Sequence, residues 1–336
     1  MVLVGGWQRR GLAEVESQPY SAVSSRPCGL QLPPTLPRGF MWDPVVELVQ
    51  GVMVLCNMDY DQYITKAIKD FRCWGVEVGR EAPIWSPLPS PPKKLFLTAS
   101  ASWEGQLAVV GGSEQHSTNV NQLEGSTYFQ LYDPRKLTWR WGPNLPAALF
   151  EGCAVAGKDD DLFVLGYFES GPTNFYLFDG KSGAWQEMPA SPHQHIRPGC
   201  TMASLGAGEE GMVAISGDHA EYFSFSRREW DELAKPLVHR SPHVRVSVGL
   251  SQGQLVVAGG YDLSLGETSH LVEAWQEGGW VQLDYLLAVA RTKQVCQHNS
   301  VTLNQSTTAP SQGDLELPAS LCASPGSGYT IGNRTG

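Results

Sequence analysis

Leu107-Ala-Val-Val-Gly111-Gly112 is an apolar run that ends in a pair of glycines, and its pattern recurs along the 336-residue chain. Neighbouring copies start 43 to 55 residues apart. The other five copies begin at Met1, Val52, Leu162, Met212 and Leu255. The copies that begin at Val52, Leu162 and Met212 keep only part of the glycine pair or none of it. Repetition at this period is typical of folds whose units bury their faces against one another. We therefore expect a repeat protein.

Each apolar run is followed by a loop, a short aromatic strand, a tryptophan, and Leu-Pro or a similar pair. In the third copy these are residues 129–133, Trp139 and Leu145-Pro146. An unbroken aliphatic run predicts a strand buried on both faces, and Asp-Pro or Asp-Gly after the aromatic strand predicts a turn. Four short strands per unit, arranged radially, make a β-propeller.

The chain resembles a kelch-repeat protein over residues 1–303. The resemblance rests on the double glycines at 5–6, 111–112 and 259–260, on Tyr132-Asp133-Pro134, and on the Trp/Leu-Pro outer strands. WD40 proteins have a similar period, but Gly-His followed by Trp-Asp is not found at blade spacing. The resemblance implies an all-β, six-bladed propeller with four antiparallel strands per blade.

The two ends of the chain predict how the ring closes. The chain starts on what should be the second strand of a blade, and residues 291–303 resemble a missing first strand. We expect this C-terminal strand to complete the first blade, which would remove an exposed sheet edge. The alternative is that a blade or domain precedes Met1. Residues 304–336 are rich in Ser, Thr, Gly and Pro, and we expect a disordered tail there.

Composition excludes several classes of function. The formal charge is −10 and no basic stripe is present, which argues against a nucleic-acid partner. No apolar segment approaches the ~20 residues that span a bilayer, and no signal-type start is found. We expect a monomeric protein without membrane contact.

Seven cysteines are scattered along the chain and none forms a CxxC pair. Cys56, Cys153 and Cys200 lie in apolar strand sequence, where cysteine acts as a small hydrophobe. This pattern predicts a reducing, cytoplasmic location. Cys73, beside Arg72, is the candidate for an exposed redox-sensitive thiol.

The sequence offers little that indicates catalysis. His193-Gln194-His195 lies in a Pro-rich inter-blade loop, and no further ligand can be named for it. The acidic run at 158–161 is expected to be a solvated turn and not a calcium loop. We therefore expect no enzyme activity, no metal and no cofactor. One alternative is a propeller enzyme acting on a small molecule in the axial funnel, and another is an actin-binding kelch protein.

The kelch resemblance implies a protein-interaction module whose partner lies across one end of the ring. The contacts would come from loops after the double glycine and from loops leading into the next blade. The predicted contact residues are Trp7, Arg38, Tyr60, His116, Phe168, Arg197, His219, Arg245, Tyr261 and Arg291. The inter-blade loops also carry Lys93, Lys94, His193 and His239. Basic loops near aromatic residues favour an acidic or phosphorylated peptide.

Two further expectations concern this binding role. Ubiquitin-ligase adaptors of the kelch type carry a BTB or F-box domain ahead of the propeller, so an adaptor role would need a longer isoform or a separate partner. Residues 59–80 are expected to form an insertion with a short helix, on the binding side of the second blade.

Overall fold

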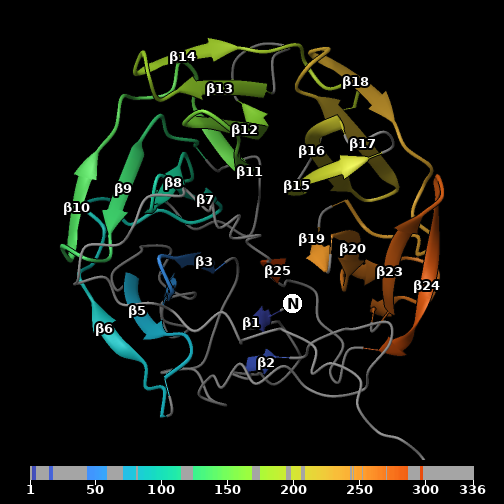
Figure 1. Cartoon of the computed structure of the whole chain (residues 1–336), viewed down its shortest axis with the longest axis horizontal. Coiled ribbons are helices and arrows are strands. Elements are labelled where there is room, and N and C mark those ends of the chain that lie inside the picture. The colour runs from blue at the N-terminus through green and yellow to red at the C-terminus, as the bar shows by residue number, and fades with distance from the viewer. Residues whose placement is uncertain are drawn as a thin grey trace, which may run out of the picture.

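The computed structural model is a ring of antiparallel sheets set around a central axis (Figure 1). The structure describes residues 2–4, 15–17, 44–58, 71–80, 82–114, 124–168, 175–193, 198–205, 209–242, 244, 246–251, 253–269, 271–286 and 296–297. In this part of the chain, no helix is long and apolar enough to cross a membrane.

Five four-stranded sheets form the blades, which we number by the copy of the repeat that each one holds. Blade two comprises β3 (Val45–Val49), β4 (Val52–Met58), β5 (Phe71–Glu77) and β6 (Ser86–Leu88). Blade three comprises β7 (Ala99–Trp103), β8 (Gln106–Val110), β9 (Phe129–Asp133) and β10 (Thr138–Trp141). Blade four comprises β11 (Leu149–Ala156), β12 (Asp161–Phe168), β13 (Phe175–Asp179) and β14 (Ala184–Glu187).

Blade five comprises β15 (Gly199–Leu205), β16 (Glu209–Ser216), β17 (His219–Ser224) and β18 (Glu229–Glu232). Blade six comprises β19 (Ser247–Ser251), β20 (Gln254–Ala258), β23 (Leu271–Gln276) and β24 (Gly279–Leu286). A separate short hairpin, β21 (Tyr261–Asp262) and β22 (Glu267–Thr268), stands between its second and third strands.

The prediction of six four-stranded blades is wrong for the described residues, which hold five. The two ends of the chain instead form a three-stranded sheet, in which β1 (Val2–Val4) pairs with β2 (Val15–Ser17) and with β25 (Cys296–Gln297). The first copy has Cys28 near the place of the outer tryptophan, so it lacks the residue that ties an outer strand to its neighbour.

The apolar runs of copies two to six are the second strands of their blades, as predicted. The glycine pair after β8 has a steric cause, because Gly111 and Gly112 adopt φ values of 63° and 93°. A Cβ on Gly112 would lie 2.7 Å from the Phe96 carbonyl oxygen. Part of the predicted insertion at 59–80 is strand β5, and residues 59–70 lie outside the described residues.

The hydrophobic core lies between neighbouring blades. One cluster joins blades three and four through residues such as Phe129, Leu149 and Phe178, and similar clusters fill the other described junctions. Because each blade buries its two faces against different neighbours, no blade is stable alone.

The outer-strand tryptophans tie each blade to the blade before it. Four indole N–H groups donate at 2.7–2.9 Å to backbone carbonyls of the preceding blade. The pairs are Trp139 with Pro89, Trp185 with Pro143, Trp230 with Pro189, and Trp280 with Ala234. We call this contact the tryptophan latch, and it explains why the repeat keeps both a tryptophan and a proline-rich exit.

Two cysteine pairs are joined as disulfides. Cys56 and Cys73 face each other across β4 and β5, and Cys153 is joined to Cys200 across the innermost strands of blades four and five. The prediction of Cys73 as an exposed redox-sensitive thiol is wrong, because its side chain is 2% exposed and bonded. Cys73 is buried because β5 pairs with β4, and the neighbouring Arg72 gave no indication of that pairing.

Candidate functional site

The connections between strands divide between the two ends of the ring. In a four-stranded meander, links between strands one and two and between three and four share one end, which we call the hairpin end. Links between strands two and three and the inter-blade links share the other end, which we call the loop rim. The described loops that were predicted to bind a partner belong to the loop rim.

A buried polar side chain in the third strand holds the loop that leads into three of the blades. Each lies two residues before the aromatic residue that faces the latch tryptophan, and each is fully buried. These clamp residues are Gln130, Glu221 and Glu273. Gln130 shows the simplest form, because its amide accepts the Lys93 backbone N–H at 2.8 Å and donates to the Lys93 carbonyl at 3.2 Å.

Glu273 in β23 faces a buried arginine. Its carboxylate accepts the Val238 backbone N–H at 3.0 Å and bonds to Arg240, and neither charged side chain has exposed surface. The Arg240 Nε–H also donates to the Gly259 carbonyl at 2.9 Å, which ties the loop to the glycine pair of blade six. Burial lowers the pKa of Arg240, and the Glu273 carboxylate opposes that shift.

Glu221 in β17 faces two polar groups of the loop that leads into blade five. It accepts the Ser191 hydroxyl, and its other oxygen lies 2.5 Å from His193 Nδ1. The His193 ring stacks on His219 with centroids 3.9 Å apart and planes at 21°. Blade five therefore gathers two imidazoles at the loop rim, held from beneath by a buried carboxylate.

Several cations of the loop rim are paired within the chain. Lys93 Nζ lies 2.9 Å from Glu114 and 5.0 Å from the Tyr128 ring centroid, and the hydrogen bond to Glu114 raises the pKa of Lys93. His239 Nδ1 lies 2.7 Å from Asp218. This part of the rim is less positive than the loop sequences alone predict, since nearby carboxylates offset its charge.

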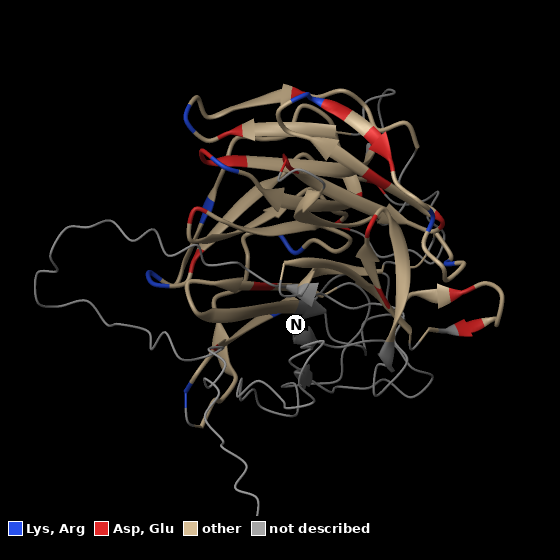
Figure 2. Cartoon of the chain, turned by 45° about the vertical axis from the view of Figure 1, so that its right-hand side comes forward, with Lys and Arg blue, Asp and Glu red and all other residues tan. Residues whose placement is uncertain are grey.

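The β21–β22 hairpin of blade six brings exposed leucines to the loop rim. The Leu263 N–H donates to the His239 carbonyl at 2.8 Å, which joins the hairpin to the inter-blade loop. Leu263 and Leu265 on the hairpin and Leu237 on that loop are 46%, 68% and 59% exposed. Figure 2 shows charged residues mainly in turns and near strand ends. Exposed leucines on two bonded loops are typical of a contact surface.

The predicted contact residues are only partly visible. His219 and Tyr261 are half-buried on the loop rim, and Phe168 ends β12 with only its backbone described. The remaining seven lie outside the described residues. They are Trp7, Arg38, Tyr60, His116, Arg197, Arg245 and Arg291.

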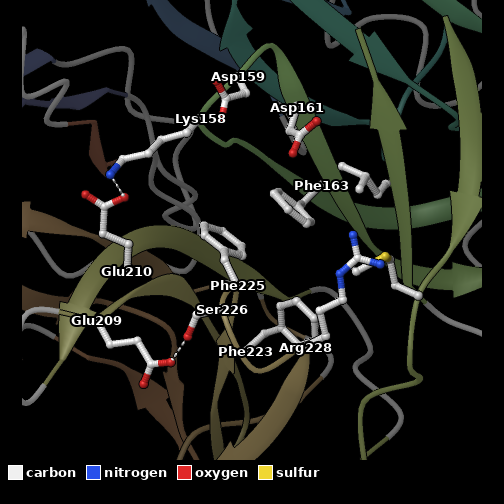
Figure 3. A pocket seen from close by; sticks show the side chains of 12 residues that line it. Lys158, Asp159, Asp161, Phe163, Glu209, Glu210, Phe223, Phe225, Ser226 and Arg228 are labelled. Carbon is white, nitrogen blue, oxygen red and sulfur yellow. Dashed lines mark hydrogen bonds and ion pairs between the residues drawn. The ribbon is translucent and has the colours of Figure 1, made fainter. Parts of the chain in front are cut away.

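A cavity of about 720 Å³ opens between blades four and five at the hairpin end (Figure 3). Phe163 and Phe225 stack there with centroids 4.4 Å apart, and Lys158 pairs with Glu210 at 2.7 Å. Burial and nearby carboxylates raise the pKa of Asp161 in its wall. The cavity lies between blades and not in the axial funnel, and its described lining holds no histidine or cysteine.

Sequence reasoning missed the clamp residues. The available signal was an acidic or amide side chain inside an otherwise apolar third strand, as in His219-Ala-Glu221-Tyr-Phe. Buried charges require partners, so such a residue points to a bonded group on a neighbouring segment. The partners Ser191 and Arg240 could not be assigned from spacing, because they lie 30 and 33 residues away.

Comparisons with known proteins agree with this architecture. Kelch domain-containing protein 8B of Homo sapiens is 32% identical over 156 residues, which cover 38% of this chain and 43% of that protein. An F-box/kelch-repeat protein of Arabidopsis thaliana is 30% identical over 31% of the chain, and kelch-like protein 35 of Mus musculus is 26% identical over 41%. The match thus spans less than half of these relatives, and no family model matches the chain.

The solved structure of YjhT supports the fold. It aligns with a TM-score of 0.56 and 14% identity over 75% of this chain and 86% of that one. At this identity the likeness concerns the fold alone. Radial four-stranded blades, glycine pairs with positive φ, tryptophan latches and the kelch relatives lead to one conclusion: the chain has a propeller fold of the kelch type and is similar to kelch-repeat proteins.

Proposed function

We propose that this propeller is a non-catalytic protein-interaction module that binds its partner across the loop rim. The observation that carries the proposal is the exposure of Leu237, Leu263 and Leu265 on two loops bonded to each other at blade six. Exposed apolar side chains on a rigid scaffold can anchor a partner, and surrounding polar groups then set its orientation. The kelch relatives support an interaction role of this general kind.

The chemistry of the partner is a finer part of the proposal. An acidic or phosphorylated peptide would be held by arginines of the inter-blade loops, namely Arg38, Arg197, Arg245 and Arg291. The described cations Lys93 and His239 contribute less, because Glu114 and Asp218 already bond to them. This part of the proposal therefore depends on the arginines.

Quantitative capture of partners from cell lysate tests the proposal. The bait is the full chain, compared with a Leu263→Ser/Leu265→Ser variant and with an Arg197→Ala/Arg245→Ala/Arg291→Ala variant. Leu137→Ser is the matched control, because this leucine is 53% exposed but lies in the turn between β9 and β10, at the hairpin end.

We expect the leucine variant to lose at least about tenfold of a captured protein, and the control to lose none. Loss in the arginine variant as well would support an acidic partner. Equal capture by the leucine variant and wild type would overturn the loop rim as the binding surface. Equal loss in Leu137→Ser would also overturn it, since that change lies at the other end.

The ring and its surroundings carry further proposals. Residues 1–303 form one domain, in which the pairing of β25 with β1 closes the ring, followed by a tail at 304–336. Gln297→Pro should then lower the melting temperature, because proline cannot donate in the β1–β25 pairing. An unchanged melting temperature would argue against closure.

Three proposals concern the cellular setting. We propose a monomer, and a role as the recognition part of a ubiquitin ligase, since one relative is named an F-box/kelch-repeat protein. The cytoplasmic location stays a prediction. The two disulfides count against it, because such bonds persist in oxidising compartments. Cell fractionation with thiol labelling of the recovered protein checks it.

A further inference from the structure

Three potential metal ligands from three segments meet at the loop rim of blade five. His193 lies in the loop that leads into the blade, His219 begins β17 and Glu232 ends β18. One ligand atom from each lies within 4.8 Å of the other two. We propose that these side chains bind a divalent transition-metal ion of the zinc class.

The donor set suits such an ion. Imidazole nitrogens and carboxylate oxygens are the ligands of many zinc sites, in which two histidines and one glutamate leave a further position open. Metal–ligand distances of about 2.0–2.2 Å place two ligand atoms of a tetrahedral site roughly 3.3–3.5 Å apart. Ligand atoms that lie up to 4.8 Å apart must therefore approach by up to about 1.4 Å. Glu232 is exposed, so its carboxylate can move toward the two imidazoles without disturbing the core.

The buried clamp residue beneath the cluster prepares one ligand. When Glu221 is ionised it can only accept, and its 2.5 Å contact with His193 Nδ1 then places the proton on Nδ1. Nε2 then carries a lone pair and no proton, which is the form of an imidazole nitrogen that ligates a metal. The Ser191 hydroxyl donates to the other Glu221 oxygen and steadies the carboxylate. A carboxylate behind a ligating histidine is the usual outer partner of protein-bound zinc.

The cluster does not use the histidine pair His193 and His195 that the sequence suggested. His195, the sequence neighbour of His193, lies outside the described residues, and the second imidazole comes from His219 in blade five. A metal there would cross-link the incoming inter-blade loop to the third and fourth strands of the blade. It would fix that loop on the surface proposed to bind a partner, but metal binding itself does not depend on that role.

Direct metal titration tests the proposal. The full chain is stripped with EDTA, dialysed and titrated with Zn²⁺ by calorimetry, and Co²⁺ is added separately as a spectroscopic probe. The ligand variants are His193→Gln, His219→Gln and Glu232→Gln. The last is at the surface and should fold normally. His239→Gln is the matched control, because this loop-rim histidine bonds to Asp218 outside the cluster.

We expect one Zn²⁺ per chain, a loss of affinity of more than tenfold in each ligand variant, and no change in His239→Gln. Glu221→Gln should weaken binding about 10- to 100-fold, as for other outer-shell partners. Gln130 occupies the equivalent position in blade three, so an amide fits there. Circular dichroism melting in EDTA checks the folding of every variant.

Three results would overturn the proposed metal site. Absence of stoichiometric uptake, or unchanged affinity in folded Glu232→Gln and His219→Gln, would overturn the site. A thiolate charge-transfer band in the Co²⁺ spectrum would also overturn it, because it would place the metal on cysteines. Binding at the proposed site without any effect on partner capture would leave the metal site intact and separate it from the proposed function.

Discussion

Blades five and six hold their incoming loops with a glutamate at the same position of the third strand, but the groups facing it differ. Glu273 faces Arg240, and both side chains are fully buried. Glu221 faces Ser191 and His193, and His193 is 33% exposed. Blade three uses an uncharged amide at this position. The clamp position therefore requires a buried hydrogen-bond acceptor. The group that faces this acceptor, which we call the counter-group, differs from blade to blade.

The counter-group decides whether the clamp of a blade is open to solvent. A guanidinium and a carboxylate that are both out of water need each other, because either one alone would be an uncompensated buried charge. Blade six is thereby committed to one arrangement. In blade five the clamp reaches solvent through the imidazole of His193, which is 33% exposed. The clamp of blade five thus has an accessible counter-group, and the clamp of blade six is closed to solvent.

The largest expected effect comes from breaking the charged clamp. Glu273→Gln keeps an acceptor for the Val238 N–H but leaves Arg240 without its carboxylate, and should cost about 3–5 kcal/mol of unfolding free energy. Glu221→Gln should cost less than about 2 kcal/mol, because its described partners are a hydroxyl and an imidazole. Urea unfolding of both variants in EDTA measures the difference.

Equal losses in the two variants would contradict the comparison. The double variant Glu273→Gln/Arg240→Met serves as the control, since it removes the stranded guanidinium. It should recover part of the stability lost in Glu273→Gln. Failure to recover would mean that the cost arises from packing and not from charge.

A further buried glutamate, Glu47, extends the comparison to a carboxyl group that keeps its proton. Glu47 in β3 of blade two accepts the Ser100 hydroxyl at 2.9 Å, and burial raises its pKa from 4.5 to about 8. Near neutral pH the folded chain therefore keeps a proton that the unfolded chain has lost. Stability due to this proton is fully present below pH 4.5 and is lost as pH rises towards 8, with a slope of up to about 1.4 kcal/mol per pH unit.

Glu47→Gln should remove that slope. At pH 7 the variant should be more stable than wild type by about 3 kcal/mol, and near pH 4.5 the two should be nearly equal. Chemical unfolding of both proteins across pH 5–8 measures this. A constant difference over the whole range would show that Glu47 is ionised in the folded chain, and blade two would then resemble blade six.

The sequence predicts the repeated parts of this molecule well and the unique parts poorly. Apolar runs, glycine pairs and tryptophans recur, so the second strands, the turns and the propeller class follow from pattern alone. The number of four-stranded blades was wrong, because the first copy departs from the pattern where the others agree.

Contacts between segments escaped prediction for a physical reason. The partner of Glu273 lies 33 residues away, and which loop residue reaches the clamp depends on how the inter-blade loop turns. The same applies to the Cys56–Cys73 bond, which needs the register of β4 against β5. The loop-rim histidines were noted one at a time from the sequence. Their meeting, His193 on His219, required the fold.

The smallest expected effect lies in the feature that blades five and six share. Trp230 and Trp280 make the same latch, donating to Pro189 at 2.9 Å and to Ala234 at 2.7 Å. Tryptophan→Phe at either position keeps an aromatic ring beside its cross-strand partner but loses one hydrogen bond, so each should cost about 1 kcal/mol. Thermal and urea unfolding of the two variants should give matching losses. A much larger loss in blade six would mean that its latch and its charged clamp act as one unit, since contacts that do not interact contribute additively.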